Sequence, residues 1–90
     1  MKIEILEWDG WVDGRQREVV GVVSIDGDEC EFELETDDGM TSIYLTDGDN
    51  RYNLEDDDDL EEIGIEDGYE IYDEILTFVC ENGFELGEED

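Results

Sequence analysis

The chain has 90 residues, of which 32 are Asp or Glu, four are Lys or Arg and none is His, so its formal net charge is −28 at pH 7. This charge would repel phosphate, which excludes nucleic acid and anionic membranes as direct ligands. Hydrophobic residues still make up 38% of the chain and fall in periodic segments. We therefore expect one small folded domain over residues 1–90 rather than a disordered chain.

The N-terminus and the cysteines indicate a reducing cytoplasm. The chain opens with charged Lys2 and Glu4 where a signal peptide would be apolar, and no apolar run approaches the ~18 residues of a membrane span. The chain has two cysteines, Cys30 and Cys80. We expect both to be buried, unpaired thiols, and a disulfide between them is the alternative.

Residues 1–54 predict an antiparallel β-meander of four to five strands. Six of the ten glycines follow an aspartate, and the chain contains no proline. Asp-Gly between alternating segments is typical of hairpins, because a type I′ turn needs positive φ at both central residues. The six dipeptides are Asp9-Gly10, Asp13-Gly14, Asp26-Gly27, Asp38-Gly39, Asp47-Gly48 and Asp67-Gly68.

Two-residue turns at Asp26-Gly27, Asp38-Gly39 and Asp47-Gly48 keep the large apolar residues on one face of the sheet. A slip by one residue would invert that face. The predicted pairs are Val23–Cys30, Gly21–Phe32, Val19–Leu34, Leu34–Ile43, Phe32–Leu45 and Ile43–Tyr52, with Arg51 beside Tyr44 on the other face.

Carboxylates and apolar residues alternate without a break over residues 29–35. Strict alternation predicts a half-buried strand, with Cys30, Phe32 and Leu34 facing the core. The four glutamates would then form an outward row with a step of ~6.8 Å. Glutamate is disfavoured in strands and like charges repel one another. A pattern that breaks local preferences indicates a functional surface.

The first two strands are predicted to be scaffold. The apolar residues change parity after Ile5, which predicts a bulge or burial on both faces near residues 8–11. Val20 and Val22 lie on the glutamate face, where they are either covered by another element or form an exposed apolar patch. Residues 1–25 carry five acids and three bases, whereas the rest of the chain carries 27 acids and one base. We therefore expect the later segments to form the working surface.

Residues 55–66 predict an acidic loop with one short helical turn that ends at Gly64. The run begins with five consecutive acids, over residues 55–59. Such a run is commonly a solvated loop. The functional interpretation is a second cluster that resembles phosphate in charge.

Residues 67–83 predict an amphipathic helix, because their apolar residues follow helical periodicity. Asp67 is a suitable N-cap with Glu70 three residues later, and Gly83 is a suitable residue just after the helix. A strand over residues 70–79 is the alternative. The helix would cover one face of the meander and leave a further row of carboxylates in solvent.

The predicted fold class is therefore α+β: an antiparallel β-meander with one C-terminal amphipathic helix packed on one face. The meander occupies residues 1–54, the acidic loop 55–66 and the helix 67–83. Residues 84–90 form a tail, with Phe84 and Leu86 tucked behind the helix.

Catalytic and metal-binding patterns are scarce in this sequence. The chain has no histidine, a single lysine and two serines, and neither a phosphate-binding glycine loop nor a zinc pattern is present. Residues 47–51 begin like a calcium-binding loop, but arginine stands at its fifth position and the glycine expected at the sixth is missing. We therefore predict a protein that is not an enzyme and binds no cofactor or dedicated metal ion.

The regular carboxylate row favours imitation of DNA charge. The lysines and arginines of a nucleic-acid groove would accept carboxylates held at regular spacing in place of phosphates. A stiff sheet loses little conformational entropy on binding, unlike a flexible acidic tail.

In its size, acidity and outward carboxylate rows, the chain resembles, as a class, the small acidic DNA-mimic inhibitors of phage origin, of the anti-CRISPR or anti-restriction type. No motif identifies one family. The resemblance implies a stoichiometric inhibitor in the cytoplasm of a bacterial host cell. Its partner would be a basic nucleic-acid-binding protein, a Cas effector first and a restriction enzyme or similar protein next. The inhibitor itself would be a monomer or a homodimer.

Two alternatives remain at this level. The chain could be an acidic binding module for another basic protein, as an immunity protein, an antitoxin or a chaperone is. It could also be an ordinary halophile domain whose acids hold hydration in strong brine. For an inhibitor, the candidate partner-binding residues are Glu29, Glu31, Glu33, Glu35, Asp37, Asp38, Asp56, Asp57, Asp58, Asp59, Glu61, Glu62, Glu70, Asp73, Glu74 and Glu81.

Overall fold

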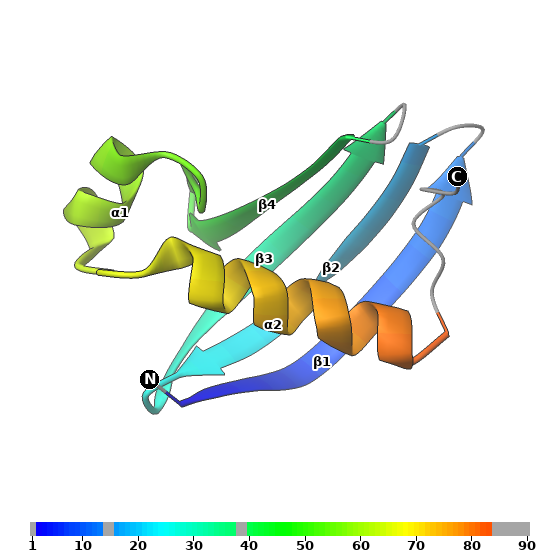
Figure 1. Ribbon diagram of the computed structural model, residues 1–90, viewed down its shortest axis with the longest axis horizontal. Helices are drawn as coiled ribbons and strands as arrows, with labels where there is room; N and C mark the ends of the chain where they lie inside the picture. Colours follow the sequence, from blue (N-terminus) through cyan, green and yellow to red (C-terminus); the bar gives the residue numbers. More distant parts are fainter. Residues whose placement is uncertain (1, 14–15, 38–39, 84–90) are drawn as a thin grey trace.

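The computed structural model describes residues 2–13, 16–37 and 40–83. Five strands form one antiparallel sheet in chain order. The elements are β1 Ile3–Asp13, β2 Gln16–Ile25, β3 Asp28–Asp37, β4 Met40–Asp47, β5 Asn50–Asn53, α1 Asp57–Ile63 and α2 Gly68–Glu81. The fold is α+β, and α2 crosses one face of the sheet, as predicted (Figure 1). We call this the inner face and the opposite one the outer face.

The register of the central strands is as predicted. The turn between β2 and β3 has φ of 54° at Asp26 and 92° at Gly27, the two positive values that a type I′ turn requires. The predicted pairs Val19–Leu34, Gly21–Phe32, Val23–Cys30, Phe32–Leu45 and Leu34–Ile43 are all present. The dipeptide Asp38-Gly39 itself lies outside the described residues.

β5 is displaced by two residues from its predicted register. Tyr52 pairs with Leu45 rather than with Ile43. The turn consists of Gly48 and Asp49, one residue later than predicted. Gly48 has φ of 64°, whereas Asp49 is not among the residues with positive φ. A type II′ turn needs glycine at its first central position, which explains the shift. A shift by two leaves the parity of the strand unchanged.

β1 contains a bulge, but the predicted position near residues 8–11 is wrong. The register shifts between Ile5 and Glu7, so Leu6 is the extra residue. A bulge reverses parity where the residue is inserted, and Trp8 therefore returns to the inner face. On the inner face the indole ring of Trp8 packs against the ring of Phe78 on α2.

The core lies between the inner face and the two helices. Tyr72 of α2 donates a hydrogen bond to the backbone carbonyl of Thr41 at 3.1 Å. Trp8 of β1 meets Phe78 of α2 edge to face, with ring centroids 6.2 Å apart. These contacts hold α2 against both β1 and β4. The buried apolar residues are Val19, Val23, Phe32, Leu34, Ile43, Leu45, Leu54, Leu60, Ile71, Ile75 and Val79.

The C-terminal helix begins and ends as predicted. The side chain of Asp67 accepts a hydrogen bond from the backbone N–H of Glu70 at 3.3 Å, and Gly83 follows the C-cap Asn82 with φ of 91°. The alternative of a strand over residues 70–79 is wrong, because the apolar residues of this segment gather on one helical face.

α1 is longer than the single helical turn predicted for the acidic loop. It spans seven residues and ends at Gly64, which has φ of 77°, as its sequence indicated. Its start lies inside the acidic run, because Asp56 is the N-cap and Leu60 anchors the helix with 6% exposure. Acids in a first helical turn also interact favourably with the helix dipole.

Both cysteines are free. Cys30 is half-buried, whereas Cys80 is exposed, so the expectation that both thiols are buried is wrong for Cys80. Cys80 follows Val79 on α2, one position round the helix from the buried face.

Neither described helix is long and apolar enough to cross a membrane. The predicted tail over residues 84–90, with Phe84 and Leu86, lies outside the described residues. So does the glycine of the predicted turn at Asp13-Gly14.

Candidate partner-binding surface

A row of carboxylates runs along β3 on the outer face, as predicted. Phe32 and Leu34 are 1% and 0% exposed on the inner face, and the residues between them point the other way. The outward positions are Glu29, Glu31, Glu33, Glu35 and Asp37. The first two and the last are exposed, and the other two are half-buried. Along the strand the step between neighbours is ~6.8 Å.

Arg51 holds one half of this row. Its Nη2 lies 3.2 Å from Oε1 of Glu33 and 2.9 Å from Oε2 of Glu35. Its guanidinium carbon lies 4.1 Å from the ring centre of Tyr44, a cation–π contact. The predicted proximity of Arg51 and Tyr44 is thus confirmed, although Arg51 pairs with Thr46 in the ladder. The other half of the row has no ion pair among the described residues and is its more negative part.

β1 adds a second rank of carboxylates that the sequence analysis missed. The pairing of β1 with β2 puts Glu4, Glu7 and Asp9 on the outer face, and all three are exposed. One strand separates them from the β3 row, so the two ranks lie ~9.4–9.8 Å apart, twice the spacing of neighbouring strands. The sequence analysis did not predict this rank because residues 1–25 have a low net charge and were therefore assigned to the scaffold. The signal that could have found it is the parity change at Leu6.

Val20 and Val22 of β2 form an apolar floor between the two ranks. Both are half-buried, and no element within residues 2–13, 16–37 and 40–83 covers them, so of the two expectations the apolar patch is the one that agrees with the described residues, as a partly exposed patch. A hollow of about 280 Å³ lies over β2, β3 and β4 beside this floor; it is lined by these valines, by Glu31 and Glu33, and by neighbouring residues, none of which belongs to β1. We call the two ranks and this floor the acidic trough.

The acids of residues 56–62 serve partly as structural groups. Asp56 accepts a hydrogen bond from the backbone N–H of Asp58 at 2.9 Å and so caps α1. Asp59 accepts one from the backbone N–H of Asn53 at 3.0 Å and fastens the helix to the end of β5. The predicted contacts that remain fully in solvent are Asp57, Asp58, Glu61 and Glu62. They lie at the α1 end of the molecule (Figure 1).

The four predicted acids of α2, Glu70, Asp73, Glu74 and Glu81, are all exposed. They lie on the side of α2 that faces away from the sheet, because its opposite side carries the buried residues. The acidic trough and this helical row are therefore on opposite sides of the molecule. One flat partner surface can contact either of them but not both. Asp38 lies outside the described residues.

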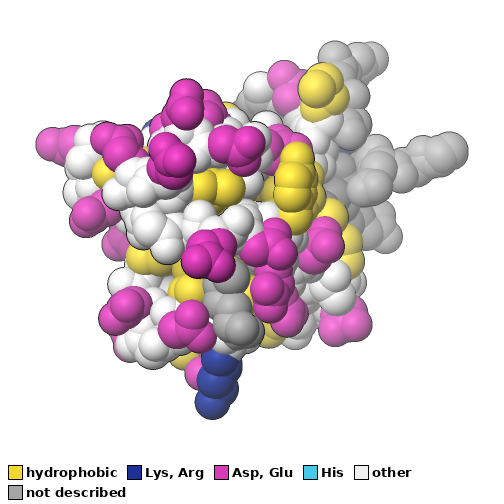
Figure 2. All heavy atoms as spheres, turned by 60° about the vertical axis from the view of Figure 1, so that its left-hand side comes forward, with side chains coloured by type: hydrophobic (Ala, Val, Ile, Leu, Met, Phe, Trp, Pro, Cys, Tyr) yellow, Lys and Arg dark blue, Asp and Glu magenta, His cyan; other side chains and the backbone are white. Residues whose placement is uncertain are grey.

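Figure 2 looks toward the side of the molecule that carries α1. Acidic side chains cover much of this view, with hydrophobic side chains exposed between them. Charge is thus not confined to the outer face. What distinguishes the acidic trough is its regular geometry, since it rests on three adjacent strands of one sheet.

The chemistry that this surface supports is binding of cations. Carboxylates accept strong hydrogen bonds from arginine and lysine, and an apolar floor can pack against the stems of those side chains. Among residues 2–13, 16–37 and 40–83, no group of three or more potential ligands is arranged to hold a metal ion.

Comparisons with protein-family models, with curated proteins and with solved structures found no match to this chain.

Proposed function

We propose that the chain is a stoichiometric inhibitor that occupies the basic nucleic-acid-binding groove of a bacterial defence protein, with its carboxylates in place of DNA phosphates. A Cas effector is the first partner to test and a restriction enzyme the second. The observation that carries this proposal is the pair of parallel carboxylate ranks in the acidic trough.

The spacing of the trough supports this role. Each strand of DNA carries one phosphate per ~3.4 Å of helix rise, so a carboxylate every ~6.8 Å along β3 matches every second phosphate. The separation of ~9.4–9.8 Å between the two ranks lies between the ~6 Å and ~12 Å widths of the two DNA grooves. Basic side chains that contact backbone phosphates in any sequence would therefore find acceptors at comparable positions.

Stiffness of the surface also supports the role. The trough is built on β1, β2 and β3, three adjacent strands of a five-stranded sheet, and Arg51 holds Glu33 and Glu35 in place. Binding of ordered groups costs less conformational entropy than binding of a flexible acidic chain.

The decisive experiment is competition with DNA. The immobilised chain is incubated with a bacterial lysate, and bound proteins are eluted with duplex DNA at constant ionic strength. A DNA mimic releases its partner to DNA, because both occupy one groove. An acidic module for another kind of basic protein, the second candidate, keeps its partner. Retention in the presence of excess duplex would contradict mimicry.

Two charge-reversal variants locate the binding surface. Glu29→Lys with Glu31→Lys changes the free half of the β3 row, and Glu70→Lys with Glu74→Lys makes the same change in net charge on the opposite side of the molecule. We expect the first variant to lose the partner and the second to keep it. Glu33 is left intact, because its replacement would also remove the ion pair with Arg51. Equal loss in both variants would remove the trough from the site.

A further inference from the structure

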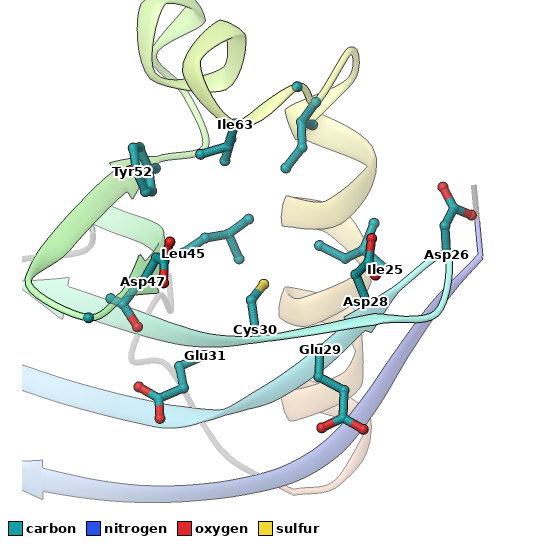
Figure 3. A pocket seen from close by; sticks show the side chains of 14 residues that line it. Ile25, Asp26, Asp28, Glu29, Cys30, Glu31, Leu45, Asp47, Tyr52 and Ile63 are labelled. Carbon is teal, nitrogen blue, oxygen red and sulfur yellow. The ribbon is translucent and has the colours of Figure 1, made fainter.

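A cavity of about 680 Å³ opens at the end of the sheet where the β2–β3 and β4–β5 turns lie. Its floor comes from the inner face of the sheet, and the segment that follows α1 closes its upper side (Figure 3). The volume is within the ~300–1,000 Å³ of ordinary ligand pockets. This cavity lies on the inner face, opposite the acidic trough, and the two border each other at Glu29 and Glu31 of β3, which are also lining residues of the cavity.

The lining of the cavity is apolar at its base. Ile25, Cys30 and Tyr52 are half-buried and Leu45 is 3% exposed. From above, Ile63 of α1 points down toward the floor (Figure 3), and Ile65 is a further half-buried lining residue. Half-buried apolar side chains that converge on one hollow are available to pack against the apolar part of a ligand.

The rim of the cavity is acidic. Asp26, Asp28 and Asp47 belong to the lining, whereas none of the lining residues is Lys or Arg. Glu29 and Glu31 extend away from the cavity toward the outer face (Figure 3). The field of the rim reaches the interior: burial raises the pKa of the Cys30 thiol, and the charges of Asp47 and Asp28 raise it further.

We propose that this cavity is an anchor pocket for an arginine side chain of the protein partner. The aliphatic stem lies on the apolar floor, and the guanidinium lies at the rim between Asp28 and Asp47. The inference rests on the proposed function in one respect, which is that the partner is a basic protein. A partner that covers the trough would extend this arginine past the end of the sheet, so that the side chain enters the cavity on the inner face.

Arginine fits this pocket better than lysine. A guanidinium is planar and weakly hydrated, offers five N–H donors and stacks on aromatic rings, and Tyr52 is in the lining. The chain already holds one guanidinium in such surroundings, since Arg51 stacks on Tyr44 and pairs with two carboxylates. Buried arginines are also among the residues that dominate binding energy at protein interfaces.

The test uses the isolated chain with n-butylguanidinium as the probe and n-butylurea as its uncharged analogue of the same shape. In an NMR titration at constant ionic strength, we expect n-butylguanidinium to shift the amide signals of the two turns and of residues 63–65. We expect n-butylurea to leave them unchanged. Equal shifts with both compounds, or shifts spread over the whole surface, would overturn the proposal.

A matched pair of variants separates the rim from general negative charge. Asp28→Asn with Asp47→Asn should raise the Kd for n-butylguanidinium at least fivefold. Glu74→Gln with Glu81→Gln removes the same charge from α2 and should change that Kd less than twofold. The amide spectrum of each variant shows directly whether the sheet is intact. An unchanged Kd in the rim variant would exclude the pocket.

Failure of this inference is distinguishable from failure of the proposed function. The probe titration contains no partner, and elution by duplex DNA does not depend on the cavity. A chain that binds n-butylguanidinium in the pocket but keeps its partner in excess DNA would have an arginine pocket without being a DNA mimic. The reverse result would leave mimicry in place and remove the pocket.

Discussion

Gly21 of β2 lies where the backbone of β1 and the Phe32 ring of β3 both come close. A Cβ atom built there would lie 2.8 Å from Cε2 of Phe32 and 2.9 Å from Cα of Trp8, and closer still to the backbone carbonyl of Glu7. Two of these three neighbours are backbone atoms of β1, which cannot move without breaking the ladder. The absence of a side chain therefore lets the bulged strand and the Phe32 ring pack together.

Gly21→Ala should consequently destabilise the domain. Overpacking of a well-filled site costs about 1–3 kcal/mol, and we expect the free energy of unfolding in a urea titration to fall by that amount. Ser24→Ala on the same strand, on the outer face, is the control and should change it by less than about 0.5 kcal/mol. A variant as stable as the wild type would show that the sheet adjusts at this point.

Cys30 makes stability depend on pH. Burial first, and then the charges of Asp47 and Asp28, raise the pKa of its thiol in the folded chain. Folding therefore favours the neutral thiol. This contribution to stability is fully present below the ordinary thiol pKa of about 8.5 and is lost as the pH rises through the higher pKa of the folded state.

A comparison of the wild type with Cys30→Ala isolates this effect, because all other titrating groups are common to both chains. We expect the free energy of unfolding to fall more steeply for the wild type once the pH exceeds about 8.5. Urea titrations at intervals between neutral and alkaline pH measure the difference. Parallel profiles for the two chains would show that the thiol is not perturbed by folding.

At the scale of elements, the sequence predicted most where local signals agreed. The β2–β3 register follows from the Asp26-Gly27 turn and from strict alternation over residues 29–35, and both signals specify the same inner face. The boundaries of α2 follow from capping residues and helical periodicity. Agreement between local and tertiary preferences is what makes such elements predictable.

The errors arose where more than one local solution was available. Gly48 can serve as the second residue of a type I′ turn or the first of a type II′ turn, and the structure has the second arrangement. The parity change after Ile5 signals a bulge in β1, but its position at Leu6 depends on how β1 pairs with β2. The second carboxylate rank was missed for this reason, since its parity follows from the bulge.

The N-cap of α2 provides a test at this scale. Asp67→Ala removes both a charge and the hydrogen bond to the backbone N–H of Glu70, whereas Asp67→Asn removes the charge and keeps a capping side chain. We expect the alanine variant to be less stable than the asparagine variant by about 1 kcal/mol. Thermal unfolding of the two variants at one ionic strength measures the difference. Equal stabilities would mean that packing alone fixes the start of α2.

At the scale of the whole molecule, charge acts in opposite directions on folding and on binding. The net charge of −28 is carried on both sides of a domain with principal extents of 34 × 24 × 24 Å. These dimensions are comparable with the Debye length of about 30 Å at 0.01 M salt and far exceed the 3 Å at 1 M. In dilute buffer, carboxylates therefore repel one another across the entire domain. In strong salt, only neighbouring carboxylates still repel one another.

We therefore expect the urea midpoint of the chain to rise as sodium chloride increases from about 0.01 to 1 M, while affinity for a basic partner falls over the same range. Circular dichroism and partner titrations at matched concentrations measure the two trends. An ordinary halophile domain would instead be unfolded in the dilute buffer, because its acids have no role outside strong brine. A chain that is folded at about 0.01 M salt and binds its partner most tightly there uses its charge for recognition. A chain that folds only near 1 M salt and binds no basic protein would show that its charge does not serve recognition.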